Sequence, residues 1–261
     1  MSPEAAKSEA DLVLHMFRTS HYNEKARWAL DWKGLAHRRV AYLPGPHAPQ
    51  IKRLTGQTAT PVLELNGRAI AGSAGIIDAL ETRFPGRPLY PSDPALREHA
   101  LDVQRRFDAE VGPAVRTVVF SVLIHELTYL RDLFAAGQPV LKRGVYRALL
   151  PLVKPMIARR NAVASDNVPR AFARTERALE DTARLVDKTG QISGDAFSVA
   201  DLTAAALLAP LAPPGHPDMA RATPVPARMQ ELYARFERHA ATQWLQEQYA
   251  RHRPASRARQ A

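Results

Sequence analysis

The sequence contains no cysteine among its 261 residues. A chain without cysteine can form neither disulfide bonds nor metal sites built on thiolates, and it has no thiol nucleophile of its own. Any thiol chemistry that the protein performs must therefore use a sulfur atom supplied by a bound ligand.

Long hydrophobic runs are missing as well. An apolar stretch at residues 117–124 is closed by His125 and Glu126, far short of the roughly 18 residues that cross a bilayer. Residues 1–10 mix charged and small side chains without the apolar core of a secretory signal, and we expect them to be a disordered lead. The sequence therefore predicts no stable membrane insertion and a location in the cytoplasm.

Acidic residues are fewer than basic ones, 26 against 36, which gives a formal net charge of +10. Such an excess can indicate a nucleic-acid-binding protein. Part of it falls near the C-terminus, at Arg251, Arg253, Arg257 and Arg259, and the rest is dispersed without an aromatic-interleaved patch. We therefore expect a solvated basic surface, no nucleic-acid partner, and a basic tail at residues 254–261.

Residues 11–90 alternate between strand and helix patterns. Short apolar runs predict strands at residues 12–17, 40–43, 61–65 and 68–70. Helical spacing of apolar residues predicts helices at residues 23–33, 48–54 and 73–84. Asn66-Gly67 predicts a hairpin between the last two strands, because both residues tolerate a positive φ. The result is an α/β unit with the order βαβαββα.

The pattern changes near residue 91, after which we expect only helices and loops. Helical segments are predicted at residues 94–135, 140–161, 168–188, 198–210 and 225–252. Apolar and basic residues combine in segment 144–160, which is typical of a helix that lies on a membrane surface or of one that packs against its domain, and we favour packing. Phe197 to Leu202 contains a capping box of Ser198 and Asp201 with an apolar staple, a stabilising feature. Residues 91–253 should therefore form an all-helical bundle domain.

Four short motifs follow one another in a characteristic order. They are the turn and helix at residues 20–30, Ala59-Thr60-Pro61-Val62-Leu63, Gly72-Ser73 with Ile76, and Leu89-Tyr90-Pro91. At this spacing they resemble the first helix, the cis-proline turn, the acidic-Ser-x-x-Ile motif and the linker of cytosolic glutathione transferases, of the serine-type, bacterial-like group. The resemblance covers most of the chain. It implies a thioredoxin-like glutathione-binding domain before the helical one, and a homodimer.

Ser20 lies where the first predicted strand meets the first helix. A free thiol has a pKa of about 8.5, and the amides of a helix's first turn together with a hydroxyl donor favour the thiolate. The resemblance implies that Ser20 is this donor to the thiol of glutathione. Tyr22 and Asn23 are alternatives, since either side chain could reach the sulfur from the same turn, and Ser20 could instead be a simple helix cap.

Further contacts with glutathione are implied at Thr60, Pro61, Gly72, Ser73, Lys52 and Gln57. A cis bond before the proline would turn the preceding backbone toward the cysteinyl part of the tripeptide. The helix amides beside Ser73 suit the γ-glutamyl carboxylate. At Gly72 the family commonly has an acidic residue that binds the ammonium group, and at Ala59 often a polar one. We therefore expect glutathione to bind weakly for this family.

An acceptor pocket is implied at Phe17, Arg18, Phe107, Val111 and Arg116. The predicted function is a glutathione transferase of the detoxification type, which activates the glutathione thiolate for attack on a hydrophobic electrophile. The alternative is a non-catalytic ligand-binding protein with the same fold.

Two other enzyme classes receive little support from the sequence. Residues 71–75 nearly match the nucleophile elbow of a hydrolase, but the helical half offers no further strands to present its acid and histidine. The nine histidines lack a metal-ligand spacing, so no metal cofactor is expected.

Overall fold

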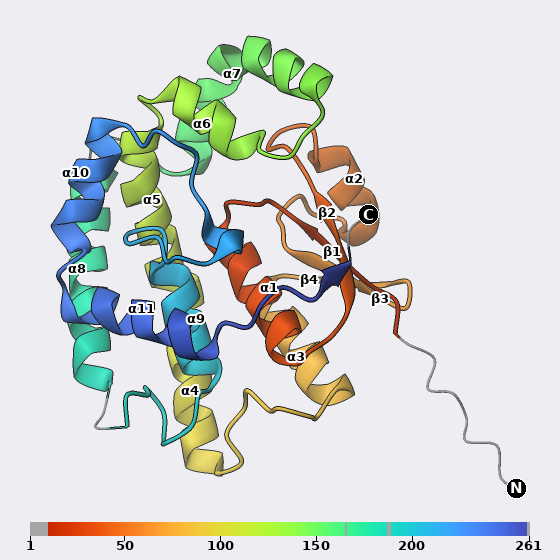
Figure 1. Cartoon of the computed structure of the whole chain (residues 1–261), viewed down its shortest axis with the longest axis vertical. Helices are drawn as coiled ribbons and strands as arrows, with labels where there is room; N and C mark the ends of the chain where they lie inside the picture. The colour runs from red at the N-terminus through yellow and green to blue at the C-terminus, as the bar shows by residue number, and fades with distance from the viewer. Residues whose placement is uncertain (1–9, 165, 187–188, 260–261) are drawn as a thin grey trace, which may run out of the picture.

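The computed structural model describes residues 10–164, 166–186 and 189–259. The predicted lead lies outside the described residues except for Ala10, and so do the last two residues of the predicted tail. The predicted boundary near residue 91 lies in the connection between helices α3 and α4 (Figure 1).

A five-stranded sheet organises the N-terminal part, in the order β4-β3-β1-β2-β5. Strands β1 (Leu12–Met16) and β2 (His37–Ala41) are parallel, whereas β3 (Val62–Leu65) is antiparallel to β1 and β4 (Arg68–Ala71) is antiparallel to β3. The β3–β4 hairpin turns at Asn66 and Gly67, both with positive φ, as predicted. The thioredoxin-like order βαβαββα is confirmed.

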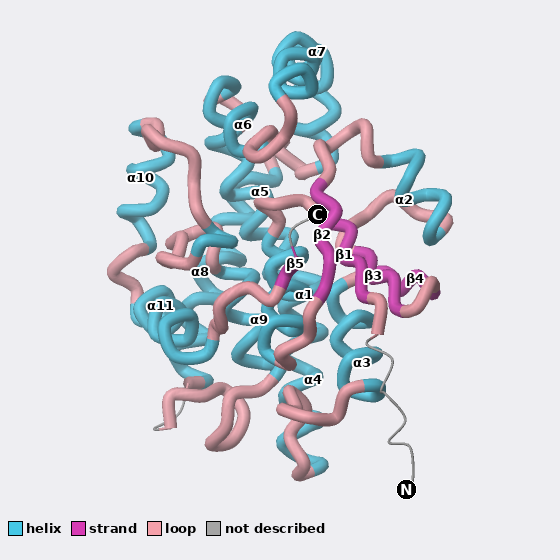
Figure 2. The backbone as a smooth tube through the Cα atoms, turned by 45° about the vertical axis from the view of Figure 1, so that its right-hand side comes forward, coloured by secondary structure: helices cyan, strands magenta, loops and turns pink. Residues whose placement is uncertain are grey.

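Three helices complete this unit: α1 (His21–Trp32), α2 (Ala48–Thr55) and α3 (Ser73–Arg83). Helices α1 and α3 pack against each other, and α1 also packs on helix α9 of the C-terminal part. Helix α2 lies on the opposite side of the sheet from α9 (Figure 2). The start of α1 therefore faces the C-terminal helices, which places the β1–α1 turn at the junction of the two parts.

The C-terminal part consists of helices joined by loops. Its helices are α4 (Pro94–Arg106), α5 (Gly112–Leu123), α6 (Leu127–Phe134), α7 (Val140–Arg160), α8 (Asn167–Leu185), α9 (Val199–Leu208), α10 (Ala227–Phe236) and α11 (Ala240–His252). The predicted single helix at 94–135 is divided, with a π-helical turn at Phe107–Val111 between α4 and α5. Because Pro113 has no backbone N–H, the regular hydrogen-bond ladder cannot continue through it.

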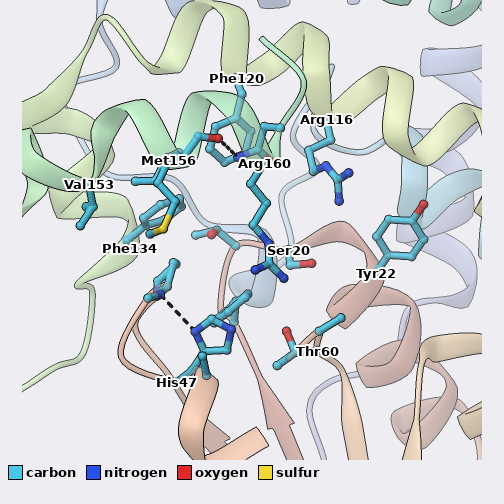
Figure 3. A pocket seen from close by; sticks show the side chains of 18 of the residues that line it. Ser20, Tyr22, His47, Thr60, Arg116, Phe120, Phe134, Val153, Met156 and Arg160 are labelled. Carbon is cyan, nitrogen blue, oxygen red and sulfur yellow. Dashed lines mark hydrogen bonds between the residues drawn. The ribbon is translucent and has the colours of Figure 1, made fainter. Parts of the chain in front are cut away.

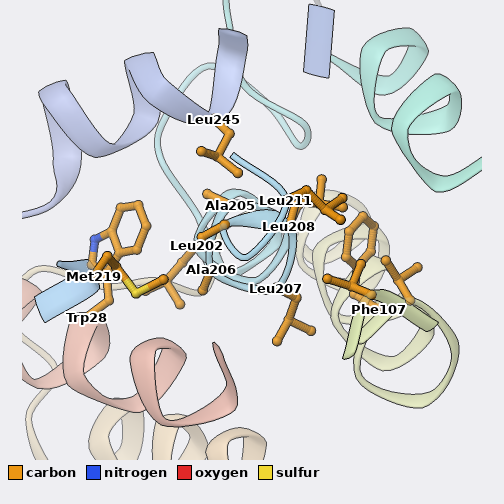
Figure 4. Packing of buried hydrophobic residues seen from close by; sticks show 14 of the residues in the cluster. Trp28, Phe107, Leu202, Ala205, Ala206, Leu207, Leu208, Leu211, Met219 and Leu245 are labelled. Carbon is orange, nitrogen blue, oxygen red and sulfur yellow. The ribbon is translucent and has the colours of Figure 1, made fainter. Parts of the chain in front are cut away.

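Helix α9 is the centre of the C-terminal core. Every residue from Val199 to Leu208 is buried, and the helix is packed on all sides (Figure 4). The predicted capping box is confirmed, with Asp201 accepting from the backbone N–H of Ser198 at 2.9 Å. The ring of Phe197 stacks on that of His252 at a centroid distance of 4.6 Å and lies tilted against that of Trp32 at 4.8 Å.

The predicted basic tail is wrong for residues 254–259. Strand β5 (Ala258–Arg259) pairs in parallel with β2 and closes one edge of the sheet. Just before it, the side chain of Arg253 is fully buried and bonds Glu24, Asp31 and Asp218 at 2.8, 2.9 and 2.8 Å. A buried arginine requires carboxylate partners, and these come from distant parts of the chain.

Helix α7 packs against its domain, as we favoured, by burying Tyr146, Leu150 and Ile157. It packs mainly on α6 and projects from the body of the molecule (Figure 1). Its outer side carries exposed apolar residues, among them Leu141 and Leu152. No helix in the described ranges is long and apolar enough to span a bilayer.

Candidate functional site

A cavity of about 270 Å³ lies between the N-terminal sheet unit and helices α5, α6 and α7 (Figure 3). The sheet unit contributes the β1–α1 turn, the segment before α2 and the cis-proline turn. The C-terminal helices contribute an apolar wall. Residues central to the lining are Phe17, Ser20, His47, Thr60, Arg116, Phe120, Phe134, Val153, Met156, Ile157 and Arg160.

Ser20 sits at the position where the chain leaves β1 and enters α1. Its backbone is extended, with φ −84° and ψ 128°, and its carbonyl accepts the helical bond from the N–H of Glu24 at 2.9 Å. The hydroxyl makes no capping bond to the helix amides and lines the cavity. Ser20 therefore does not act as a simple helix cap, which was the alternative to a role in binding. The hydroxyl of Ser20 is available to a ligand.

Tyr22 also borders the cavity, but its hydroxyl is already engaged. It donates to the backbone carbonyl of Asp108 at 2.6 Å. Burial, together with the nearby Asp108 carboxylate, raises the pKa of Tyr22 to about 12. The ring is held against Gly112, where an added Cβ would lie 2.8 Å from the tyrosine Cζ. Of the two alternatives to Ser20, Tyr22 is thus committed to joining α1 to the π-helical turn.

Asn23 is fully buried behind the cavity wall. Its side-chain amide donates to the hydroxyl of Thr60 at 3.2 Å, which joins α1 to the cis-proline turn. The Thr60-Pro61 bond is cis, as predicted. Thr60 lines the cavity opposite α7, and Asn23 supports it from behind.

The remaining residues implied for glutathione lie around the cavity without lining it. Gly72 has φ +80° and precedes α3, so the helix cap falls on Gly72 and Ser73 is the first, buried residue of the helix. Lys52 is exposed on α2. The side chain of Gln57 bonds the backbone of Ala59, donating to its carbonyl at 3.0 Å. The structure brings neither Lys52 nor Gln57 into the cavity.

The residues implied for the acceptor pocket divide into two groups. Phe17 and Arg116 line the cavity. Phe107 and Val111 are buried at 2% and 4% exposure in the core, because the π-helical turn directs them inward, and this corrects their predicted place. The side chain of Arg18 is exposed and lies against Gly137, outside the cavity.

The sequence interpretation missed the contribution of α7. Val153, Met156, Ile157 and Arg160 recur at helical spacing along one edge of this helix, and all four line the cavity. That spacing signals a common face but not what the face meets. His47, Phe120 and Phe134 were also missed, since each is an isolated residue in its own segment.

Two histidines at the cavity are held neutral. Burial, and then the charge of Arg116, lowers the pKa of His21 to about 3, and its Nε2 donates to the carbonyl of Gly112 at 3.0 Å. Burial lowers the pKa of His47, whose Nδ1 accepts from the N–H of Gly45 and whose Nε2 donates to the carbonyl of Thr58. Both nitrogens of His47 are engaged, so it is not poised to act as a base.

The sheet unit matches a known family. Residues 14–88 match the model of the glutathione S-transferase N-terminal domain. A glutathione S-transferase of Pseudomonas putida is 28% identical over 106 residues, which cover 41% of this chain and 48% of that protein. The match thus spans about half the length of this curated relative.

Solved structures with the same fold cover nearly the whole chain. The β-etherase LigF from Sphingobium sp. strain SYK-6 has a TM-score of 0.60 at 19% identity, over 91% of this chain and 99% of its own. A glutathione S-transferase from Pseudomonas fluorescens has a TM-score of 0.62 at 18% identity, over 94% and 98%. One from Methylobacterium radiotolerans, in complex with glutathione sulfonate, has a TM-score of 0.55 at 20% identity, over 96% and 98%.

Residues 14–88 are thus a glutathione S-transferase N-terminal domain, and the chain as a whole has the fold of the cytosolic glutathione transferase superfamily. The predicted resemblance to this family is confirmed at residues 14–88, and the predicted fold is confirmed for the whole chain. In the described residues, no group of three or more histidine, aspartate or glutamate side chains is arranged to hold a metal ion.

Proposed function

We propose that the protein is a glutathione transferase that activates the thiol of glutathione at Ser20 and transfers the glutathionyl group to a hydrophobic electrophile. The observation that carries the proposal is the Ser20 hydroxyl, which is left uncapped at the start of α1 and faces the cavity. The family of residues 14–88 supports glutathione as the cosubstrate.

The positive end of α1 and the Ser20 hydroxyl would together favour an anionic sulfur over a neutral thiol. The thiol proton passes to solvent, and the thiolate forms a bond to the electrophilic carbon. The leaving group departs with the electron pair of the bond that breaks. A donor aimed at an anion contributes about ten- to a thousandfold to such a step, which is the role assigned to Ser20.

In this proposal, glutathione is bound by the turn at Thr60-Pro61 and by the start of α3. The turn at Thr60-Pro61 brings Thr60 into the cavity lining, where its backbone could pair with the cysteinyl part of the tripeptide. The start of α3, at Ser73, offers helix amides for the γ-glutamyl carboxylate. Because Gly72 has no side chain to meet the ammonium group, we expect weaker binding than in relatives with an acid there. Lys52 and Gln57, which the resemblance implies for the glycine carboxylate, do not line the cavity.

The electrophile would occupy the apolar part of the cavity. Phe17, Phe120, Phe134, Val153 and Met156 line it from four different segments of the chain. An apolar body enclosed by these side chains would be removed from water beside Ser20.

Turnover of glutathione with an aryl halide activated by nitro groups tests the proposal, in wild type and in Ser20→Ala. We expect measurable conjugation and its loss in the variant. Calorimetric binding of glutathione without any turnover, for several electrophiles, would instead favour the non-catalytic binder.

Other expectations belong to the same proposal. Residues 11–90 would bind glutathione, and residues 91–253 would supply the acceptor wall. We also infer a homodimer, a cytoplasmic location and a role in detoxification. Light scattering of the purified protein tests the dimer directly.

A further inference from the structure

Two arginines point into the cavity from the neighbouring helices α5 and α7, and no acidic residue lines the cavity with them. Arg116 descends from α5 and Arg160 from the last turn of α7, both toward Ser20 (Figure 3). The residues that line the cavity include no aspartate or glutamate. Among the described residues, neither arginine forms an ion pair. The cavity therefore carries an uncompensated positive charge.

Arg116 is the more constrained of the two. Its Nε is buried and has no hydrogen-bond partner within the described part of the chain. A buried donor without a partner is costly to folding, and most such donors in native proteins are satisfied. Burial lowers the pKa of Arg116 below its ordinary value, and the charge of Arg160 lowers it further. Both guanidinium groups lie at the same cavity, where a bound anion would compensate their charges.

A specific contact fixes the spacing of the two helices at this point. The hydroxyl of Thr117 donates to the backbone carbonyl of Asn161 at 2.9 Å. These residues directly follow Arg116 and Arg160 in sequence, so the bond ties α5 to the end of α7 next to both arginines. The hydrogen bond therefore fixes the backbone positions from which Arg116 and Arg160 extend into the cavity.

The neighbouring groups add no negative charge. His21 and His47 are neutral, and the high pKa of Tyr22 keeps its hydroxyl protonated. A smaller cavity of about 40 Å³ adjoins the first and shares Arg116 with it. Its lining includes Arg221, whose Nε is likewise buried without a partner. The positive region thus extends from Arg160 past Arg116 to Arg221.

Beside Arg160 the walls are apolar, with Phe120, Phe134 and Met156 on the side away from Arg116 in the view of Figure 3. Such a combination suits a molecule with an apolar body and one anionic group. We infer that the electrophilic acceptor is a small aryl or alkyl carboxylic acid, whose carboxylate Arg116 and Arg160 bind while its apolar body lies against the phenylalanines. This inference rests on the proposed function and specifies its substrate class.

Arginine suits this role because its planar guanidinium donates two parallel bonds to a carboxylate. Two other roles compete with it. The arginines could act only on the glutathione thiolate, by favouring the anionic sulfur, or they could bind a carboxylate of glutathione itself. Each role affects a different measured quantity, so one set of experiments separates the three.

The test compares two electrophiles that differ in charge but not in shape. The probes are 4-(chloromethyl)benzoate and 4-(chloromethyl)benzamide, each with glutathione. Both present the same chloromethyl carbon: the sulfur bonds to it and chloride leaves with the electron pair. We measure the ratio of kcat/KM for the acid to that for the amide in wild type, Arg116→Met, Arg160→Met and Arg160→Lys. Arg159→Met is the matched control, since Arg159 is exposed on the same helix and does not line the cavity.

In wild type the acid should be preferred over the amide. The ratio should fall about ten- to a hundredfold in Arg116→Met and in Arg160→Met, the range for losing a charge-assisted hydrogen bond. Arg160→Lys should keep part of the preference, and Arg159→Met should keep all of it. Circular dichroism verifies folding, and Arg160→Met carries the test if Arg116→Met fails to fold.

Three outcomes would overturn the inference. Wild type could show no preference for the acid. The acid and the amide could lose rate equally in both variants, which would assign the arginines to the thiolate. The ratio could stay constant while the Kd for glutathione rises, which would assign them to a glutathione carboxylate.

A binding measurement without turnover separates this inference from the proposed function. Calorimetry compares 4-methylbenzoate with 4-methylbenzamide, neither of which can react with a thiol. If wild type conjugates neither probe but binds 4-methylbenzoate, and Arg160→Met does not, the transferase proposal fails and the carboxylate site stands. If conjugation proceeds with no difference between acid and amide, the transferase proposal stands and the carboxylate site fails.

Discussion

Replacing Arg253 should destabilise the protein more than replacing any exposed arginine. Its guanidinium makes three ion pairs, with Glu24, Asp31 and Asp218, and its side chain is 0% exposed. Two further arginines share these carboxylates, since Arg27 pairs with Glu24 and Arg39 pairs with both aspartates. The cluster thus balances three cations against three anions and joins α1, β2 and the end of α11.

The variant Arg253→Met fills similar space without the charge, so three carboxylates would face two arginines in a buried site. Removing one member of a buried ion pair costs about 3–5 kcal/mol, because the remaining charge loses its compensation. For a chain of this size, that corresponds to a fall of roughly 6–20 °C in Tm. Strand β5 should also detach, since the arginine holds the chain just before it.

The same cluster predicts how the difference in stability between wild type and Arg253→Met depends on pH. Burial raises the pKa of Glu24, but Arg253 and Arg27 outweigh it and lower the pKa below its ordinary value. The pKa of Asp218 is lowered to about 2, against burial, by Arg27, Arg39 and Arg253. Depressed carboxyl pKa values stabilise the folded state above the unfolded pKa of about 4, and this stability is lost as pH falls toward 2. The difference in the free energy of unfolding between wild type and Arg253→Met should therefore become smaller as the pH falls from 7 to about 3.

Urea and thermal unfolding followed by circular dichroism measure both effects. Arg251→Met is the matched control, because Arg251 lies two residues away with 61% of its side chain exposed. It should change the free energy of unfolding by no more than about 0.5 kcal/mol. The reasoning would be refuted if Arg253→Met were as stable as Arg251→Met, or if their difference stayed constant down to pH 3.

Further predictions concern the site and its supports. Ser20→Ala should lower kcat/KM by about ten- to a thousandfold in the conjugation assay. Its Tm should hardly change, since the hydroxyl makes no capping bond. Tyr22→Phe should keep most activity and lose about 1 kcal/mol in urea unfolding, because its hydroxyl bonds Asp108 and not the ligand; a reversed pattern would assign the thiol donor to Tyr22. Gly112→Ala should cost about 1–3 kcal/mol, as the new methyl group would overlap the ring of Tyr22. Gly72→Asp should cost about 1–3 kcal/mol and fail to tighten glutathione binding in calorimetry, because φ +80° and ψ 145° disfavour any side chain. Tighter binding in this variant would show that the loop can adapt.

Local sequence patterns were sufficient to predict the strands and helices of the N-terminal unit. The predicted strand at 12–17 forms over Leu12–Met16, and the hairpin turns at Asn66-Gly67. Alternation, helical spacing and turn residues act over a few positions, so a sequence read locally contains them. Ser20 is of the same kind, because its place at the strand–helix junction follows from its two neighbours in the chain.

The positions of several residues could not be predicted from the sequence, because they depend on contacts with distant parts of the chain. Arg253 looks like part of a basic tail because its three carboxylates lie far away, at positions 24, 31 and 218. Phe107 was expected at a pocket, but the π-helical turn before Pro113 directs it into the core. Arg160 reaches the cavity that Ser20 lines only because the end of α7 is tied to α5 there. None of these placements has a local signal.

The positive net charge divides into groups with different physical roles. Lys25 and Arg253 are fully buried, and each is matched by a carboxylate, Asp108 for the lysine at 2.7 Å. The ion pairs compensate these two buried charges and so stabilise the fold. Arg116 lies at the cavity without such a match, although a partner for its buried Nε would lower the folding cost. Within the described part of the chain, Lys25 and Arg253 are paired, whereas Arg116 and Arg221, which line the two adjoining cavities, each have a buried Nε without a partner. A positive charge left unpaired at a cavity is the behaviour expected of a ligand-binding residue.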